Sequence, residues 1–342
     1  MSDQFWAGMA IILMSGVFNG GFALPMKYSR RWQWENTWLV FSFVSLLLIP
    51  GALAGGLVPN LWEVYRDVRT PALVIPLLFG FLWGIAQVTF GLGIKMVGVA
   101  LTFAVVSGLG SLTGSLVPLL VFNPEDLFRP RGLLLLLSIP ILIAGLVLYG
   151  IAGRRRENEQ SALTAGTGLV QGSFAAGLAI CIFTGIFGSS FNLGFAFGGD
   201  VIRSSVQHGA GALTATYAIW AVVLGAGFIP SFVYCGYLLV RNRSAALFLS
   251  AGSGRDALLG MAMGVIWATG IITYGIGATL VGRYGTSLGF MLFIAISILS
   301  ANIFGLMTGE WRGTSSRTRK LLHGAVGVIM VAVVVLNLGG LF

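Results

Sequence analysis

The chain has 342 residues, of which 9% are charged and 56% hydrophobic, and its formal net charge is +9. Soluble globular proteins carry about 25% charged residues and about 45–50% apolar ones, so this composition excludes an ordinary soluble domain. The charged residues are also bunched, and they leave ten charge-free segments of at least 22 residues. About 20 apolar residues suffice to cross the hydrocarbon core of a bilayer as a helix.

In chain order the charge-free segments are 4–26, 36–62, 70–94, 96–124, 132–153, 160–199, 204–240, 257–282, 284–309 and 321–342. A chain inside lipid must satisfy its own backbone groups, as a helix or as a closed barrel. Barrel strands alternate in polarity over about ten residues, whereas these runs are continuous. We therefore predict an all-α membrane protein with ten transmembrane helices. The chain starts MSDQFW, without the basic region of a cleaved signal peptide, so the first helix is expected to be retained.

The basic residues are distributed unevenly between the two sides of such a bundle. The connections after the first, third, fifth, seventh and ninth expected helices hold fourteen of the twenty Lys and Arg residues. The richer side is cytoplasmic by the positive-inside rule, which places both termini in the periplasm. This pattern explains the positive net charge without nucleic acid. Tryptophans cluster beside expected helix ends, where an interfacial aromatic belt is the favoured interpretation and a direct substrate role the alternative: Trp32, Trp34, Trp38 and Trp62.

Several stretches of the first half recur in the second half. Seven of nineteen positions are identical between GFLWGIAQVTFGLGIKMVG at 80–98 and GVIWATGIITYGIGATLVG at 264–282. Residues 15–26 resemble 184–195, and an Ile-Pro pair at 49–50 recurs at 229–230. The matches keep their order, so the first, second and third expected helices pair with the sixth, seventh and eighth, as a duplicated five-helix unit requires. Because five is odd, the second copy is inverted, as in many secondary transporters.

This symmetry predicts a five-plus-five inverted repeat. The first repeat covers 1–153, a cytoplasmic connecting loop covers 154–166, and the second repeat covers 167–342.

Several short motifs are distinctive: Pro25 and Lys27, WQWENTW at 32–38, PNLW at 59–62, WGIAQVTFGLG at 83–93 and GEW at 309–311. In these motifs the chain resembles the L-rhamnose-proton symporter family of the drug/metabolite transporter superfamily. The resemblance implies a ten-helix fold of the drug/metabolite transporter type and proton-driven sugar uptake at a bacterial inner membrane. The segment 272–290 departs from the family pattern, which leaves the particular sugar open. The alternative is a facilitator or exporter of another small polar metabolite, because fold does not fix substrate or direction.

A sugar site inside a membrane needs amides or hydroxyls for the ligand's hydroxyl groups and aromatic faces for its C–H surface. The candidate amides are Asn19, Gln87, Asn192 and Asn302, and hydrogen bonding between helices is the alternative role for each. Trp83 and Trp267 are equivalent in the repeat and are expected to line a cavity, with plain packing as the alternative. Tyr274 lies two helical turns after Trp267 on the same face.

No carboxylate falls in the middle of a charge-free segment, so no proton carrier is evident. Glu35 lies at a helix start near Lys27 and is the first candidate, followed by Glu310 and Asp200. His208 is expected in a loop, and Cys181 and Cys235 are expected to be buried thiols.

The sequence contains no HExxH, no Cys/His cluster and no phosphate-binding GxxxxGK[ST] motif. We therefore expect a transporter rather than an enzyme, with no metal and no cofactor. The expected partners are a small sugar, a proton and the lipid bilayer.

Overall fold

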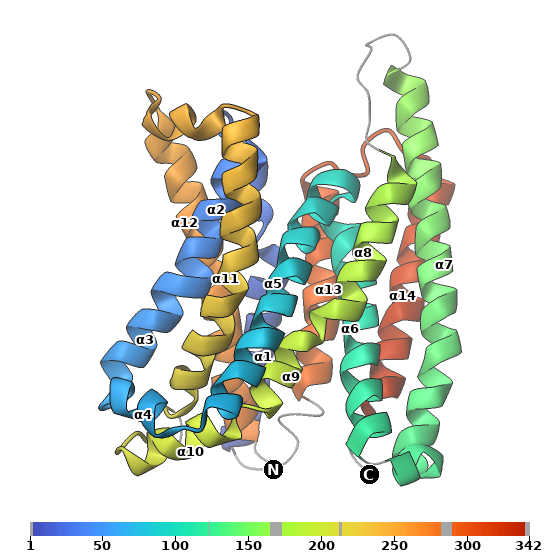
Figure 1. Cartoon of the computed structure of the whole chain (residues 1–342). Helices are drawn as coiled ribbons and strands as arrows, with labels where there is room; N and C mark the ends of the chain where they lie inside the picture. The colour runs from blue at the N-terminus through green and yellow to red at the C-terminus, as the bar shows by residue number, and fades with distance from the viewer. Residues whose placement is uncertain (1–2, 123, 165–172, 212–213, 282–288, 339–342) are drawn as a thin grey trace. The chain divides into compact units, whose positions relative to one another are not determined.

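The computed structural model describes residues 3–122, 124–164, 173–211, 214–281 and 289–338, and its regular structure in these ranges is helical (Figure 1). Within the described ranges, eight helical segments are long and apolar enough to cross a membrane, and they coincide with eight of the ten expected spans. The other two expected spans contain α6 (Val99–Phe122) and α13 (Phe290–Met307), with shorter apolar stretches at Val99–Thr113 and Leu292–Met307. The prediction of an all-helical membrane protein is confirmed.

The chain divides into two compact units. Unit 1 consists of Met1–Gly21, Thr89–Ile186 and Thr269–Phe342, and unit 2 consists of Phe22–Val88 and Phe187–Ala268. Each unit therefore takes chain from both predicted repeats. Residues 154–164, predicted to belong to the connecting loop, continue a long helix, and residues 165–166 lie outside the described ranges.

Unit 1 is a helical bundle in which a long helix packs along the last one. Its elements are α1 (Asp3–Gly21), the end of α5 (Thr70–Val97), α6, η3 (Pro124–Phe128), α7 (Pro130–Thr164), most of α8 (Phe174–Gly188), the second half of α12 (Ser253–Val281), α13 and α14 (Ser316–Leu338). Helices α7 and α14 lie side by side (Figure 1). A side chain at Gly145 would come within 2.7 Å of Ile329, so the close approach of these helices depends on glycine.

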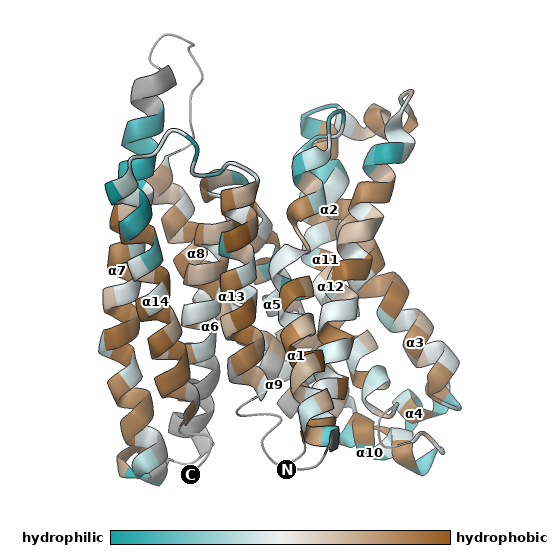
Figure 2. Ribbon diagram, turned by 180° about the vertical axis from the view of Figure 1, so that it is seen from behind, coloured by the Kyte–Doolittle hydropathy of each residue, from teal (hydrophilic) through white to brown (hydrophobic). Residues whose placement is uncertain are grey.

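The last turns of α7 are polar, in contrast to the apolar length before them (Figure 2). Arg156 donates to the carbonyl of Val97 at 2.9 Å, and its guanidinium lies 5.0 Å from the ring centre of Trp311. Glu159 accepts hydrogen bonds from the backbone N–H of Ser315 (2.6 Å) and the hydroxyl of Thr318 (2.8 Å), at the start of α14. These bonds explain why the predicted connecting segment stays helical beyond the apolar span.

Unit 2 contains more short helices. Its elements are η1 (Leu24–Tyr28), α2 (Trp34–Ser42), η2 (Phe43–Leu48), α3 (Ile49–Leu57), α4 (Leu61–Asp67), the first part of α5, α9 (Ser190–Ala196), α10 (Gly199–Gln207), α11 (Thr216–Arg241), η4 (Ser244–Leu249) and the first half of α12. Helices α2 and α3 are joined through η2, a π-helical turn. Such widened turns occur frequently at functional sites.

Glycines bring the backbones of α5 and α11 together within unit 2. An added Cβ would lie 2.3 Å from the carbonyl oxygen of Val223 at Gly80, and 2.3 Å from that of Gly227 at Gly84. Gly80 and Gly84 are one turn apart and share a helix face, and Gln87 follows on that face. The close contact at these glycines therefore places Gln87 beside α11.

The short helices α4 and α10 pack against each other and against the start of α11. Val64, Val201 and Ile219 are fully buried in this cluster. Burial raises the pKa of the Tyr65 phenol to about 12, so the protonated hydroxyl donates to the carbonyl of Ala218 at 2.9 Å. Thus α4, which lies between the expected second and third spans, packs against α10, which lies between the expected sixth and seventh spans.

Candidate functional site

The predicted site residues fall into two sets. Unit 1 holds Asn19, Tyr274, Asn302 and Glu310, and unit 2 holds Glu35, Trp83, Gln87, Asn192, Asp200 and Trp267. Asn192 lies on α9, but its side chain is outside the described part of the structure.

Gln87 on α5 is a buried amide of unit 2 that forms hydrogen bonds with side chains of other helices. The indole N–H of Trp38 donates to Gln87 Oε1 at 3.3 Å, and the hydroxyl of Ser231 donates to the same oxygen at 2.8 Å. An indole N–H only donates, which fixes the oxygen of the amide on this side. The other end, Gln87 Nε2, is buried without a hydrogen-bond partner among the described residues.

Trp34 adds a second indole to this cluster. Its ring stacks on Trp38, with centroids 5.4 Å apart and an interplanar angle of 15°, and it meets Tyr234 edge-on at 6.2 Å. Trp34 Nε1 is also buried without a partner in the described ranges. Trp32, Trp34 and Trp38 are 9%, 8% and 0% exposed, so the interfacial-belt interpretation is wrong for these three. It remains compatible with Trp62, which is 79% exposed.

Trp83 and Trp267, which occupy matching positions in the similar stretches 80–98 and 264–282, lie close together. Their ring centroids are 6.1 Å apart at an angle of 31°, and Trp83 also lies 5.1 Å from Phe191. Both indoles are half-buried. The pair could offer aromatic faces to a sugar ring, whose C–H surface packs on such faces.

Glu35, in the first turn of α2, is almost completely buried at 1% exposure. Its Oε1 accepts hydrogen bonds from Asn242 Nδ2 at 2.8 Å and from Ser244 Oγ at 2.7 Å. Both donors lie at the junction of α11 and η4. The hydrogen-bond donors to this buried carboxyl group are thus side chains of another element.

The amides of unit 1 make bonds between helices. Asn19 Nδ2 on α1 donates to Ser297 Oγ on α13 at 3.0 Å. Asn302 Oδ1 on α13 accepts from the hydroxyl of Tyr149 on α7 at 2.7 Å, and Asn302 Nδ2 donates to a carbonyl of its own helix at 2.8 Å. These bonds correspond to the alternative role considered for each amide.

Tyr274 packs in an aromatic group of the same unit. Its ring centroid lies 4.8 Å from that of Phe293 and 6.0 Å from that of Phe290.

Glu310 forms hydrogen bonds with the backbone at the start of α6. Its two oxygens accept the backbone N–H groups of Val99 (2.9 Å) and Ala100 (3.3 Å), the first residues of α6. Gly98 has a positive φ of 92°, and a Cβ there would lie 2.9 Å from Glu310 Oε2. The carboxylate therefore stabilises the N-terminus of α6, where negative charge is favourable.

Asp200 forms an ion pair with Arg203 on the exposed face of α10. Cys181 and Cys235 are buried free thiols, as expected. Across the described residues, no group of three or more His, Cys, Asp and Glu side chains could hold a metal ion.

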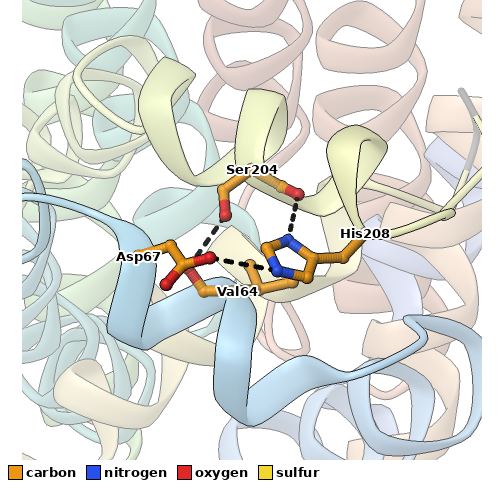
Figure 3. Close-up of polar contacts among 4 residues, drawn as sticks. All are labelled: Val64, Asp67, Ser204 and His208. Carbon is orange, nitrogen blue, oxygen red and sulfur yellow. Dashed lines mark hydrogen bonds and ion pairs between the residues drawn. The ribbon is translucent and has the colours of Figure 1, made fainter.

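His208 caps the C-terminal end of α10 and links it to α4 (Figure 3). Its Nδ1 lies 2.9 Å from the carbonyl oxygen of Ser204, and its Nε2 lies 3.1 Å from a carboxylate oxygen of Asp67. The hydroxyl of Ser204 donates to the carbonyl of Val64 at 3.0 Å. The residue predicted in a loop thus sits at a helix end, where it joins two helices.

Sequence reasoning missed Trp34, Trp38 and Ser231 around Gln87. It also missed Asn242 and Ser244, which bond to Glu35. Trp34 and Trp38 were visible in the WQWENTW segment, but their position beside a helix end favoured an interfacial role. Ser231 follows the repeated Ile229–Pro230 pair, which could have drawn attention to it. Asn242 and Ser244 lie in a polar connection and carry no signal of their own.

The similarity to known proteins covers nearly the whole chain. Residues 1–341 match the family model described as L-rhamnose-proton symport protein (RhaT). A relative named L-rhamnose-proton symporter from Escherichia coli O1:K1 / APEC is 23% identical over 346 residues, with 99% of each chain covered. Relatives of the same name from Pectobacterium atrosepticum and Shigella dysenteriae are 24% and 23% identical, over 98% and 99% of each chain. The chain therefore belongs to the L-rhamnose-proton symport protein family, a family of transporters and not of enzymes.

Proposed function

We propose that this protein imports a small neutral sugar, L-rhamnose or a related monosaccharide, by proton symport with alternating access. Its membership in the symport family supports proton-coupled sugar transport. The relatives named for L-rhamnose are only 23–24% identical, so the particular sugar is part of the proposal. The bacterial relatives and the apolar helices support a location in a bacterial inner membrane.

The observation that carries the proposal is the composition of the first turn of α2. Trp34 belongs to an indole and amide cluster that suits a polyhydroxy ligand, and the next residue, Glu35, is a buried carboxylate. A symporter must link substrate binding to proton binding. Trp34 and Glu35 lie on one helical turn, so a displacement of that turn changes the surroundings of both residues. This displacement would link sugar binding to proton binding.

We assign the residues of unit 2 as the first candidates for these roles. Gln87, Trp83 and Trp267 would contact the sugar, and Glu35 would carry the proton. The other predicted residues remain second candidates: Asn19, Asn192, Tyr274 and Asn302 for the sugar, and Glu310 and Asp200 for the proton.

The proposal includes a five-plus-five inverted repeat of the drug/metabolite transporter type. Two features of the chain support it. The matched segments 15–26 and 184–195 each contain a helix interruption, after Gly21 in α1 and at Ser189 between α8 and α9. The matched helices α5 and α12 each contribute to both units. Discontinuous helices at corresponding positions are typical of transporter repeats.

Reconstitution tests the proposal directly. Proteoliposomes containing the full chain should accumulate labelled L-rhamnose when an inward proton gradient is imposed, and a protonophore should abolish accumulation. Accumulation of another monosaccharide under the same conditions would keep symport and replace the substrate. Equilibration without accumulation would indicate a facilitator, and uptake driven by an outward gradient would indicate an exporter.

A further inference from the structure

Two N–H donors in unit 2 are buried without an acceptor. Trp34 Nε1 and Gln87 Nε2 have no hydrogen-bond partner among the described residues, and both residues are 8% exposed. Leaving a buried donor unpaired is unfavourable, so two such donors in one cluster require an explanation.

The two donors belong to one connected set of side chains. Trp34 stacks on Trp38, and Trp38 in turn donates to Gln87 Oε1. Ser231 donates to the same oxygen, so both lone pairs of the Gln87 amide oxygen are used. Turning the amide over would set its NH₂ group against the indole N–H of Trp38. The cluster therefore presents fixed donors and no spare acceptor at Gln87.

A ligand that completes this cluster must bring acceptor oxygens. Hydroxyl, carbonyl and carboxylate oxygens all accept hydrogen bonds. The side chains of Trp38, Ser231 and Tyr234, which contact the two donor residues, carry no positive charge to pair with an anionic ligand, and burying an unpaired charge is unfavourable. The stacked indoles add apolar faces for C–H groups. These features select a neutral polyhydroxy compound.

We infer that Trp34 determines specificity by donating its indole N–H to one hydroxyl oxygen of the sugar, while Gln87 Nε2 donates to a second. The inference rests on the proposed function and adds the recognition chemistry to it. Trp34 is a substrate-contacting residue in this scheme, and Trp38 and Ser231 are positioning residues that orient the Gln87 amide.

The test uses purified full-length protein and the substitution Trp34→Phe, which keeps an aromatic ring and removes the N–H. The dissociation constant for L-rhamnose is measured by calorimetry, together with those for a panel of its monodeoxy analogues. We expect Trp34→Phe to weaken L-rhamnose binding about tenfold, the worth of one hydrogen bond. One analogue should bind the unchanged protein about tenfold more weakly than L-rhamnose and lose nothing further in the variant.

Trp311→Phe is the matched control. Its indole N–H is also buried without a partner in the described residues, but it belongs to unit 1 beside Arg156. This variant should bind L-rhamnose as the unchanged protein does. If Trp34→Phe does not fold, the analogue panel on the unchanged protein still decides, because two donors require two hydroxyls whose removal weakens binding.

The outcomes separate the inference from the proposed function. Equal affinity of Trp34→Phe and the unchanged protein for L-rhamnose would overturn the donor role and leave symport intact, with water as the partner of the indole. Tight binding of a sugar acid in place of neutral sugars would overturn the ligand class. Failure of the folded protein to bind any neutral monosaccharide would overturn both the inference and the proposed substrate.

Discussion

At the scale of single residues, Glu35 and Glu310 occupy similar positions in the sequence but different surroundings in the structure. Both lie near helix ends in the sequence. Glu310 accepts hydrogen bonds from two backbone N–H groups at the start of α6. Glu35 accepts its hydrogen bonds from the side chains of Asn242 and Ser244, which can rearrange without unfolding a helix. For this reason Glu35 is the first candidate for the proposed proton carrier.

We predict that Glu35→Gln separates exchange from accumulation. An amide keeps the shape of the side chain and cannot take up a proton, so the variant should still exchange labelled for unlabelled sugar across proteoliposomes. Accumulation against a gradient should be lost, because no proton is carried with the sugar. The measurement compares counterflow with proton-driven uptake in the same preparation.

Glu63→Gln is the control for this prediction. Glu63 lies in the first turn of α4, is exposed and is not a candidate for carrying the proton. This variant should retain both exchange and accumulation. Normal proton-driven accumulation by Glu35→Gln would show that another group carries the proton.

At the scale of helices, the contact between α5 and α11 depends on the absence of side chains. We predict that Gly84→Ala lowers thermal stability in detergent and reduces sugar binding. An added Cβ would lie 2.3 Å from the carbonyl oxygen of Gly227, which forces the two backbones apart and shifts Gln87 from Ser231. Overpacking of this kind costs about 1–3 kcal/mol.

Gly225→Ala is the matched substitution on α11. A Cβ at Gly225 meets no atom within 4 Å, so this variant should keep the stability and the affinity of the unchanged protein. Equal behaviour of the two variants in thermal unfolding would contradict the role given to the glycine contact.

The pair of short helices in unit 2 gives a second prediction at this scale. His208→Ala removes the side-chain bridge from α10 to Asp67 on α4, and it should accelerate amide hydrogen exchange in residues 61–67 and 199–207. The loss of one such bond is about 1 kcal/mol, or roughly a fivefold faster exchange where local opening controls it. Arg203→Ala, on the exposed face of α10, should leave the exchange of residues 61–67 unchanged. Protection of 61–67 that is the same in both variants would contradict the bridge.

At the scale of the whole molecule, the distribution of charge predicts the orientation in the membrane. Fourteen of the twenty basic residues lie on the side expected to be cytoplasmic, which places both termini in the periplasm. A fluorescent protein that folds only in the cytoplasm should stay dark when fused after Phe342, and alkaline phosphatase at the same position should be active. The opposite pair of results would reverse the side of every connection.

The sequence alone determined the class of the molecule, because charge-free length is a local property. The length of each apolar segment is by itself enough to predict that it can cross a bilayer as a helix. The described structure agrees with that prediction. The resemblance to the family could also be recognised from the sequence, because its motifs are contiguous stretches of chain such as residues 32–38 and 83–93.

Only the tertiary structure decided which side chains meet. Gln87 bonds with Trp38 and Ser231, which lie 49 and 144 positions away in the chain. In a soluble helix an apolar stripe identifies the packed face, but a helix that is apolar all round carries no such stripe. The packed face is then set by close approach of small residues such as Gly84 and Gly227. For the same reason the burial of Trp34 and Trp38 could not be read from their place beside a helix end.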